Sequence, residues 1–393
     1  MTFRMVKTIY LKEMLDMFRD RRSLISMIVV PVLAVPSLFA VVHYFTQNLG
    51  KKAQNESARV GISASVSQPG LTGALKSVGF ELVPQTDARA AVENKSVAAS
   101  LDLTRAADGT GQIVIYVDKT REASSIAAER LTAFLERLKL EQVKSSLRGL
   151  GVSERVLNPF TVKSTNVAPA KKMAGFILGS VLGYAVLLLM FTGGMYPAID
   201  MTAGEKERHT METLLASPAS REEIVLGKVL ATTTASFLTA MLTIASILIS
   251  IQRAGLGQGG GEFERLVSRA APDASTVVLV LLTLLPTALF AASVMIAIAL
   301  FARGFKEAQS LLTPVVMAVV VPAVVGMLPG IELNVGLALI PVFNVSQLIK
   351  EIVLGEFSHL AFLAAFLSNV FYALVAFWFS VRIFKTESVL FRS

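Results

Sequence analysis

Six long apolar runs constrain this chain more than any other feature. A run of about 20 apolar residues is long enough to cross the roughly 30 Å hydrocarbon core of a bilayer. Only 17% of the residues are charged, which is low for a soluble protein. The sequence therefore predicts a polytopic α-helical membrane protein with six transmembrane helices. The runs cover residues 24–45, 173–199, 229–251, 274–302, 308–331 and 360–381.

Charge predicts how these spans are oriented. Arginines at positions 19, 21 and 22 precede the first run, and Arg382 and Lys385 follow the last, so both termini are expected in the cytosol of a multi-pass cell (inner or cytoplasmic) membrane protein. The first run is too long for the apolar part of a signal peptide and is expected to stay as a span. The net charge of +8 fits cytosolic loops beside anionic lipid. No compact basic domain remains that would bind nucleic acid.

Residues 1–22 precede the first transmembrane helix, which is predicted over 23–45. Their apolar side chains lie on one side of a helix: Phe3, Val6, Tyr10, Met14 and Met17, extended by Leu11, Leu15 and Phe18. This pattern predicts a cytosolic amphipathic helix in the plane of the membrane interface. The alternative is a helix packed against a cytosolic domain.

Residues 46–172 form the only sizeable polar piece of the chain. Short runs rich in β-branched residues at 59–63, 80–83, 97–103 and 112–117 predict strands. They alternate with helical patterns at 71–78, 87–94 and 121–150, so we expect an α/β domain. A single preceding span places this domain outside the cytosol. The chain has no cysteine, so disulfides and cysteine metal sites are excluded.

Residues 173–393 are predicted to hold transmembrane helices two to six and one segment that does not span. That segment, 332–357, ends with Glu351 and Glu356 and is predicted to be re-entrant or interfacial on the outer side. The alternative is a seventh crossing over 335–354. It would place Arg382 and Lys385 outside, against the charge rule.

A charged segment, 202–228, separates the second and third apolar runs. Thr202 with Glu205, and Ser220 with Glu223, fit the capping box, in which a hydroxyl and a carboxylate satisfy backbone N–H groups at a helix start. Pro218 is expected to end the first of these helices. The segment thus predicts a short helix over 204–216 on the cytosolic face, inside a coupling segment at 202–222, followed by a new span. The alternative is a solvated loop.

The same segment carries a family resemblance. Glu205-Lys-Glu-Arg208, Thr210-Met-Glu-Thr-Leu-Leu215, Ser217-Pro218 and Gly227-Lys228 resemble the signature between the second and third spans of ABC-2 type transporter permeases, and are most similar to the NatB-like sodium-efflux permease subfamily. Residues 12–23, 306–314, 322 and 340–344 resemble other parts of that family. The resemblance covers the whole chain in the same order.

The resemblance implies the membrane permease subunit of an ATP-binding-cassette exporter that couples ATP hydrolysis to efflux of sodium ions. It implies two permeases, as a homodimer in the lipid bilayer, with two separate ATPase subunits that use ATP and magnesium. The chain shows no nucleotide-hydrolysis motif, so no enzyme activity and no cofactor of its own are expected. The short helix would carry the motion of the ATPase into spans two and three. Its predicted coupling residues are Glu205, Lys206, Glu207, Arg208, Thr210, Met211, Glu212, Leu214 and Leu215.

Polar residues inside the spans are candidates for the substrate path, because buried polar groups in a membrane are costly and commonly face a cavity or a neighbouring helix. Sodium prefers oxygen ligands such as hydroxyls, amide oxygens and free backbone carbonyls. The alternative for each residue is a hydrogen bond to a helix backbone. The predicted path residues are Thr192, Thr239, Thr313, Asn344, Gln347 and Asn369.

Two other functions stay open at this point. The same architecture suits export of an amphipathic organic compound, such as a drug, a peptide or a lipid. A ligand-binding membrane receptor or scaffold, whose outer domain signals inward, is an interpretation from a different class. No acidic residue lies at the centre of a clear span, which speaks against proton-coupled transport.

Overall fold

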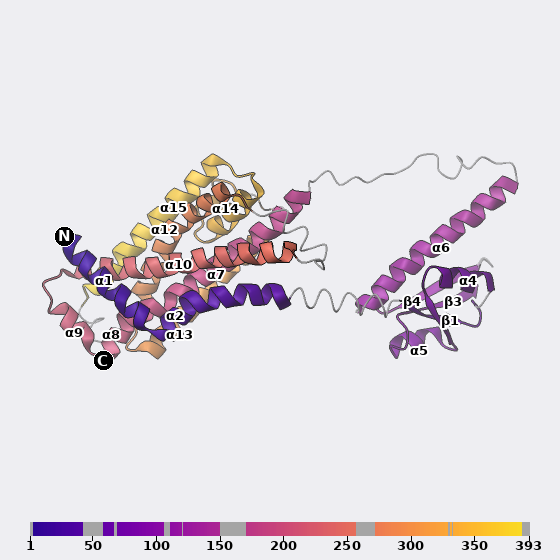
Figure 1. Ribbon diagram of the computed structural model, residues 1–393, viewed down its shortest axis with the longest axis horizontal. Coiled ribbons are helices and arrows are strands. Elements are labelled where there is room, and N and C mark those ends of the chain that lie inside the picture. The colour runs from indigo at the N-terminus through magenta and orange to yellow at the C-terminus, as the bar shows by residue number, and fades with distance from the viewer. Residues whose placement is uncertain are drawn as a thin grey trace. The chain divides into compact units, whose positions relative to one another are not determined.

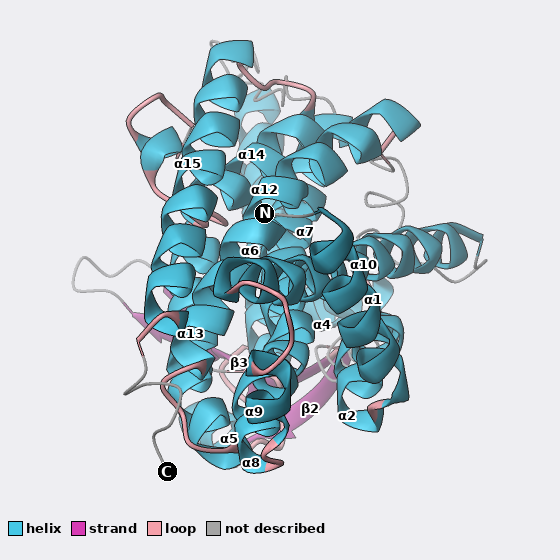
Figure 2. Ribbon diagram, turned by 90° about the vertical axis from the view of Figure 1, so that its left-hand side faces the viewer, coloured by secondary structure: helices cyan, strands magenta, loops and turns pink. Residues whose placement is uncertain are grey.

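The computed structural model describes residues 3–41, 58–66, 69–105, 111–119, 121–149, 170–256, 272–328, 331 and 333–386. The chain divides into two compact units, Met1–Ala40 with Asn166–Ser393, and Val41–Thr165. Figure 2 shows the strands in magenta and the helices in cyan. All strands of the described residues belong to the second unit. Two predicted boundaries lie outside the described residues: the start of the α/β domain at residue 46 and the start of the non-spanning segment at residue 332.

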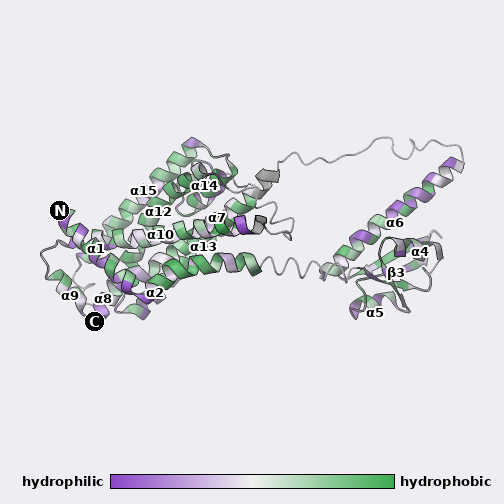
Figure 3. Cartoon of the chain, viewed as in Figure 1, coloured by the Kyte–Doolittle hydropathy of each residue, from purple (hydrophilic) through white to green (hydrophobic). Residues whose placement is uncertain are grey.

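The first unit is a helical bundle with six helices in its described part that are long and apolar enough to cross a membrane. This number agrees with the predicted number of spans. Figure 3 shows these helices mostly in the green of apolar residues. The spans are Arg21–Val41, Gly175–Glu207, Arg221–Arg253, Ala274–Ala299, Phe305–Val325 and His359–Phe384.

The spans correspond to the main helices in Figure 1, where α7 runs through the centre of the bundle. It packs against α10, α12, α13 and the shorter α14, while α12 also packs against α15. The first span begins with α2 (Arg21–Leu24) and a π-helical turn, η1 (Ile25–Val29). The others are α7 (Ala170–Ile199), α10 (Arg221–Leu256), α12 (Ala274–Ala299), α13 (Phe305–Val325) and α15 (His359–Phe384).

The predicted N-terminal helix is present as α1 (Phe3–Arg19), and its place in the membrane interface stays a prediction. The stripe that faces α10 contains Val6, Ile9, Met17 and the charged Glu13, all buried. Of the other apolar side chains, Tyr10 and Met14 are half-buried, and Phe3, Leu11, Leu15 and Phe18 are exposed. One stripe of α1 thus packs against the bundle, while a second set of apolar side chains is left for the predicted membrane interface.

Asp20 ends α1 and caps α2. Its carboxylate accepts hydrogen bonds from the backbone N–H groups of Arg22 (3.3 Å) and Ser23 (2.8 Å) and from the Ser23 hydroxyl (2.7 Å). Partial burial works to raise the pKa of Asp20, but these hydrogen bonds outweigh it and lower the pKa.

Asp20→Ala is expected to lower the free energy of unfolding by about 1 kcal/mol at neutral pH, because it removes a helix cap. A group whose pKa is lowered by folding stabilises the fold above its unfolded pKa of about 3.9, and this contribution is lost as pH falls through the folded pKa. Unfolding in detergent near pH 7 and near pH 3 measures both parts. Asp20→Asn, which can still accept the hydrogen bonds, serves as the control. Equal stability of the Ala variant and wild type at pH 7 would contradict the prediction.

The segment after the second span is not the single helix that was predicted over 204–216. A π-helical turn, η3 (Asp200–Gly204), leads into α8 (Glu205–Glu207), and α9 (Thr210–Leu215) follows. His209 separates α8 from α9, since its φ of 56° is left-handed and cannot continue a right-handed helix.

The two predicted capping boxes have different outcomes. The first is wrong: the Thr202 hydroxyl donates to the Ala198 carbonyl at 2.6 Å, so Thr202 continues the second span instead of starting a helix. The second is confirmed. The Ser220 N–H donates to Glu223 Oε2 at 2.9 Å, and the Glu223 N–H donates to Ser220 Oγ at 3.3 Å.

The last irregular part of the bundle centres on α14 (Phe343–Leu354), a helix of 12 residues. It is preceded by the short 3-10 helix η4 (Leu337–Leu339). At about 1.5 Å per residue, α14 is too short to cross a bilayer. Its side of the membrane stays a prediction.

Three glycines on α7, at positions 175, 179 and 183, face α14. A Cβ atom at Gly179 would lie 2.9 Å from the Cα of Lys350, and one at Gly183 would lie 2.9 Å from the Ser346 carbonyl oxygen. The glycines therefore form a groove on α7 in which the α14 backbone lies, the close approach that small residues allow between membrane helices.

The second unit has the predicted succession of strands and helices, while its side of the membrane stays a prediction. Strand β1 (Arg59–Ser63) is parallel to β2 (Glu81–Gln85) and to β3 (Ala99–Arg105), and β3 is antiparallel to β4 (Gly111–Val117). The strand order is β2-β1-β3-β4. The helices are α4 (Pro69–Ser77), α5 (Ala88–Glu93) and α6 (Glu122–Gly149).

Candidate functional site

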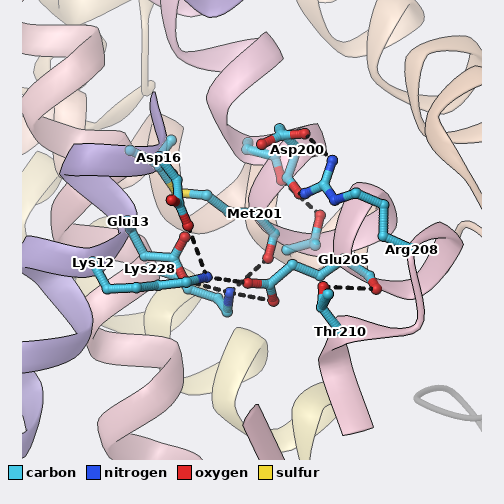
Figure 4. A network of polar contacts seen from close by, with 12 residues as sticks. Lys12, Glu13, Asp16, Asp200, Met201, Glu205, Arg208, Thr210 and Lys228 are labelled. Carbon is cyan, nitrogen blue, oxygen red and sulfur yellow. Dashed lines mark hydrogen bonds and ion pairs between the residues drawn. The ribbon is translucent and has the colours of Figure 1, made fainter. Parts of the chain in front are cut away.

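A buried ionic network lies where α1, the η3–α8 segment and the first turns of α10 meet (Figure 4). At its centre is Lys228, whose side chain is 1% exposed. The ammonium group lies 2.7 Å from Glu13 Oε1 and 2.6 Å from Glu205 Oε2, and it donates to the Met201 carbonyl at 2.7 Å. These three bonds use all three donors of the lysine.

The close approach of α1 to α10 places Glu13 in this network. A Cβ atom at Gly227 would lie 2.6 Å from Ile9 Cγ2, so only glycine lets the two helices come this near. Glu13 lies one helical turn after Ile9 on the same face of α1 and therefore points at Lys228, the neighbour of Gly227. In the sequence Gly227-Lys228, the glycine thus allows α1 to contact α10, and the lysine supplies the positive charge that binds Glu13.

Lys12 extends the network toward the surface. Its ammonium bonds to Glu205 Oε1 and lies 3.2 Å from Glu13 Oε1 and 3.3 Å from Asp16 Oδ2. Burial works to lower the pKa of Lys12, but the carboxylates of Glu13 and Glu205 outweigh burial and raise the pKa above its ordinary value. The ammonium is therefore firmly charged, and it shares both carboxylates with Lys228.

A pocket of about 300 Å³ opens beside these charges, and Arg208 lies on its other side. The Arg208 guanidinium bonds to Asp200 Oδ1 at 2.7 Å and to the Asp200 carbonyl at 3.3 Å, which raises the pKa of Arg208. The Thr210 hydroxyl donates to the Glu205 carbonyl at 3.3 Å. Residues on both sides of the left-handed break at His209 are thus bonded to η3 and α8.

Two further contacts join α8 to the turn between α12 and α13. Lys206 donates to the carbonyls of Leu300 and Ala302. Glu207 Oε2 accepts from the Phe305 N–H, the first residue of α13, at 2.7 Å. Through these contacts α8 meets two spans in addition to the two that flank it in sequence.

The predicted coupling residues therefore divide into three groups. Glu205, Lys206, Glu207, Arg208 and Met211 contact the rest of the chain, and Met211 is buried in the bundle core. Leu214 and Leu215 are half-buried and pack against that core. Thr210 and Glu212 are exposed. The exposed charges of this segment are those of Glu212 and of Glu207 and Arg208, and the latter two also bond within the chain.

The predicted path residues do not come together in one site. Thr192, Thr239 and Thr313 donate to carbonyls of their own helices, 2.8 to 2.9 Å away and four residues earlier. Asn369 does the same with Ala365 at 2.8 Å. These four have the backbone bonds that the alternative interpretation expects.

Asn344 and Gln347, by contrast, bond from α14 to other elements. Asn344 Nδ2 donates to the Ala338 carbonyl and to Ser368 Oγ, both at 2.9 Å, and Gln347 Nε2 donates to the Gly326 carbonyl at 3.1 Å. Among the residues that the structure describes, no group of three or more His, Asp or Glu side chains is arranged to hold a metal ion.

Sequence reasoning missed the roles of Glu13, Lys228 and Lys350. One signal was available for Glu13, because it falls in a stripe with Val6, Ile9 and Met17 at helical spacing. A charge in a stripe that is otherwise apolar indicates a buried partner. Lys228 lies one residue before the predicted third span. A lysine at the end of a span ordinarily contacts water, so its burial was not predicted.

Most of the chain is similar in sequence to known proteins. Residues 21–382 match the family described as ABC-2 family transporter protein. The chain is 26% identical over 366 residues to the ABC transporter permease protein NatB of Bacillus subtilis (strain 168), a match that covers 89% of this chain and 90% of that protein. No solved structure matches the chain.

Proposed function

The chain belongs to the ABC-2 family of transporter proteins, and from this we propose that it is the permease subunit of an ATP-driven sodium exporter. The observation that supports a permease driven by a partner is the buried network of Lys12, Glu13, Glu205 and Lys228. It fastens the short helices after the second span to α1 and to the third span. A separate ATPase subunit that moves α9 would displace these elements together.

The proposed relay reaches four spans. The π turn η3 continues directly from α7, and Glu205 is bonded to Lys228 of α10. The bonds of Lys206 and Glu207 lead to α12 and α13. We propose that two copies of the permease work with two ATPase subunits, which bind the ATP and magnesium, and that the exposed face of α9 contacts the ATPase.

Sodium as the cargo rests on two likenesses, the resemblance to sodium-efflux permeases and the match to the Bacillus protein NatB. The amide side chains of Asn344 and Gln347 on α14 are compatible with this cargo. Amide and carbonyl oxygens are uncharged ligands of the kind that a monovalent cation uses in broken-helix sites of transporters.

The experiment is ATP-driven sodium flux into inside-out proteoliposomes that carry this chain with its cognate ATPase. We expect flux with ATP and none without it. Glu212→Lys is expected to reduce both ATPase association and flux at least tenfold, because Glu212 is exposed on α9 and its reversal places a like charge at the contact. Glu129→Lys, the same change at an exposed position of α6, is the control and should leave both unchanged.

The possible failures have different meanings. ATP hydrolysis without sodium movement would remove sodium as the cargo and favour an amphipathic organic compound. Unchanged association of Glu212→Lys with the ATPase would contradict the role of α9.

A further inference from the structure

Far along α7 from the ionic network, α14 carries a second buried lysine. Lys350 is 3% exposed. Its ammonium donates to the carbonyl oxygens of Gly326 (3.1 Å) and Ile331 (3.2 Å) and lies 5.4 Å from the centre of the Phe176 ring. Carbonyl dipoles and an aromatic face are groups that hold a desolvated cation.

The carbonyl of Gly326 is well suited to a cation. Gly326 is the C-cap of α13, and the last carbonyls of a helix have no partner within the helix. The C-terminal end of a helix also carries a partial negative charge. Ile331 follows in the connection after α13. Helix ends and unwound carbonyls of this kind coordinate sodium in transporters with discontinuous helices.

The amide of Gln347 lies beside the Gly326 carbonyl and carries a further oxygen. Its Nε2 donates to the same Gly326 carbonyl that accepts from Lys350, so the amide and the ammonium are neighbours. Because a carbonyl oxygen can only accept a hydrogen bond, the end of the amide that faces it is the NH2 group. The Oε1 atom is buried and accepts no hydrogen bond from the described part of the chain. An uncommitted buried oxygen is costly unless something binds it.

The surrounding backbone holds these groups in place. Val342, just before α14, has a φ of 69° and a ψ of −51°, and the Phe343 N–H bonds to the Pro341 carbonyl at 2.8 Å. This is a γ-turn of the strained type, which is rare for a β-branched residue. Such strain persists where the structure over-determines it, and it clusters at ligand sites.

We propose that the carbonyl oxygens of Gly326 and Ile331, with Gln347 Oε1, form a sodium site, and that the Lys350 ammonium occupies the two carbonyls of this site in the present state. Sodium takes the place of the ammonium when the flexible lysine side chain withdraws. The uncharged ligands suit an ion of one charge, whereas divalent ions select carboxylates. The inference rests on the proposed sodium export and adds a place for the ion.

The test is sodium binding to the full permease–ATPase complex in detergent, without ATP, comparing wild type with Lys350→Met. Removal of the ammonium should open the site. In the variant, 100 mM sodium chloride is expected to raise Tm by roughly 3 °C over choline chloride at equal ionic strength. Binding of radioactive sodium should rise at least tenfold over wild type. Lys139→Met, which removes an exposed lysine on α6, should behave as wild type.

A second substitution separates the site from a general effect of charge. Adding Gln347→Leu to Lys350→Met should abolish the sodium-specific rise in Tm, since one of the three oxygens is lost. A folded Lys350→Met variant that neither binds sodium nor responds to it would overturn the inference, as would equal responses to sodium and choline. If Lys350→Met does not fold, Gln347→Leu alone decides: an unchanged KM for sodium in ATP-driven flux would overturn the inference.

Sodium flux by wild type is measured in parallel. Flux without binding in the variant would refute this site and leave the proposed function standing. Binding without flux would support the site and refute sodium export.

Discussion

Lys228→Met is expected to lower the free energy of unfolding by about 3–5 kcal/mol, because it leaves the buried carboxylates of Glu13 and Glu205 with one ammonium instead of two. Lys12 is the remaining partner, and it is 43% exposed. Reversible unfolding in mixed micelles measures the change. A drop of this size is a large part of the stability of an ordinary protein, so we also expect much less of the variant in the membrane.

The chain offers a matched control at its other end. The Lys385–Glu222 pair has the same N–O distance, 2.6 Å, as the Lys228–Glu205 pair, but its side chains are 52% and 49% exposed, against 1% and 3%. Lys385→Met should therefore change stability little, because water screens exposed pairs. Combining Lys228→Met with Glu205→Gln restores neutrality and should recover part of the loss. Equal losses from Lys228→Met and Lys385→Met would show that burial of the network does not matter.

Gly179→Ala is expected to displace α14 and to abolish transport. The new methyl group would lie 2.9 Å from the Cα and 3.0 Å from the carbonyl oxygen of Lys350. These are backbone atoms that cannot rotate away, so a helix has to shift, at a cost of about 1–3 kcal/mol. Flux and unfolding measure the two effects. ATPase association should persist, because α9 follows the opposite end of α7, roughly 30 Å away at 1.5 Å per residue.

Two other glycines serve as controls for Gly179→Ala. At Gly175 the nearest atom would be 3.5 Å from the new Cβ, an ordinary contact, so Gly175→Ala should be much milder. At Gly73, in α4, nothing lies within 4 Å, so Gly73→Ala should be neutral or stabilising by about 0.5–1 kcal/mol. If Gly179→Ala and Gly175→Ala were indistinguishable, the groove would not determine where α14 lies.

The sequence predicted those features that depend on local pattern. Apolar length is sufficient to place a span, and the capping box of Ser220 and Glu223 is complete within four residues. The same pattern at Thr202 and Glu205 gave a wrong prediction of a helix start. The second span continues through these residues, and Glu205 binds Lys228 on another helix. A local pattern does not include that competing partner.

The remaining part of the site depends on packing between distant segments. Glu13 and Lys228 are 215 residues apart, and their contact requires the close approach at Gly227. Lys350 lies in a short amphipathic helix, where a lysine ordinarily faces water. Its burial follows from the glycines of α7, whose partner helix no local pattern identifies.

The π-helical turn η3 has a consequence for how force enters the second span. A π turn holds about one residue more than an α turn, and such turns are frequent at functional sites. Were η3 to revert to an α turn, everything beyond Gly204 would rotate about the helix axis by about 100°, the angle between successive residues. That rotation would carry Glu205 off Lys228. A push from the partner subunit would then rotate the end of the second span about its own axis and shift it by one residue, instead of tilting the whole helix.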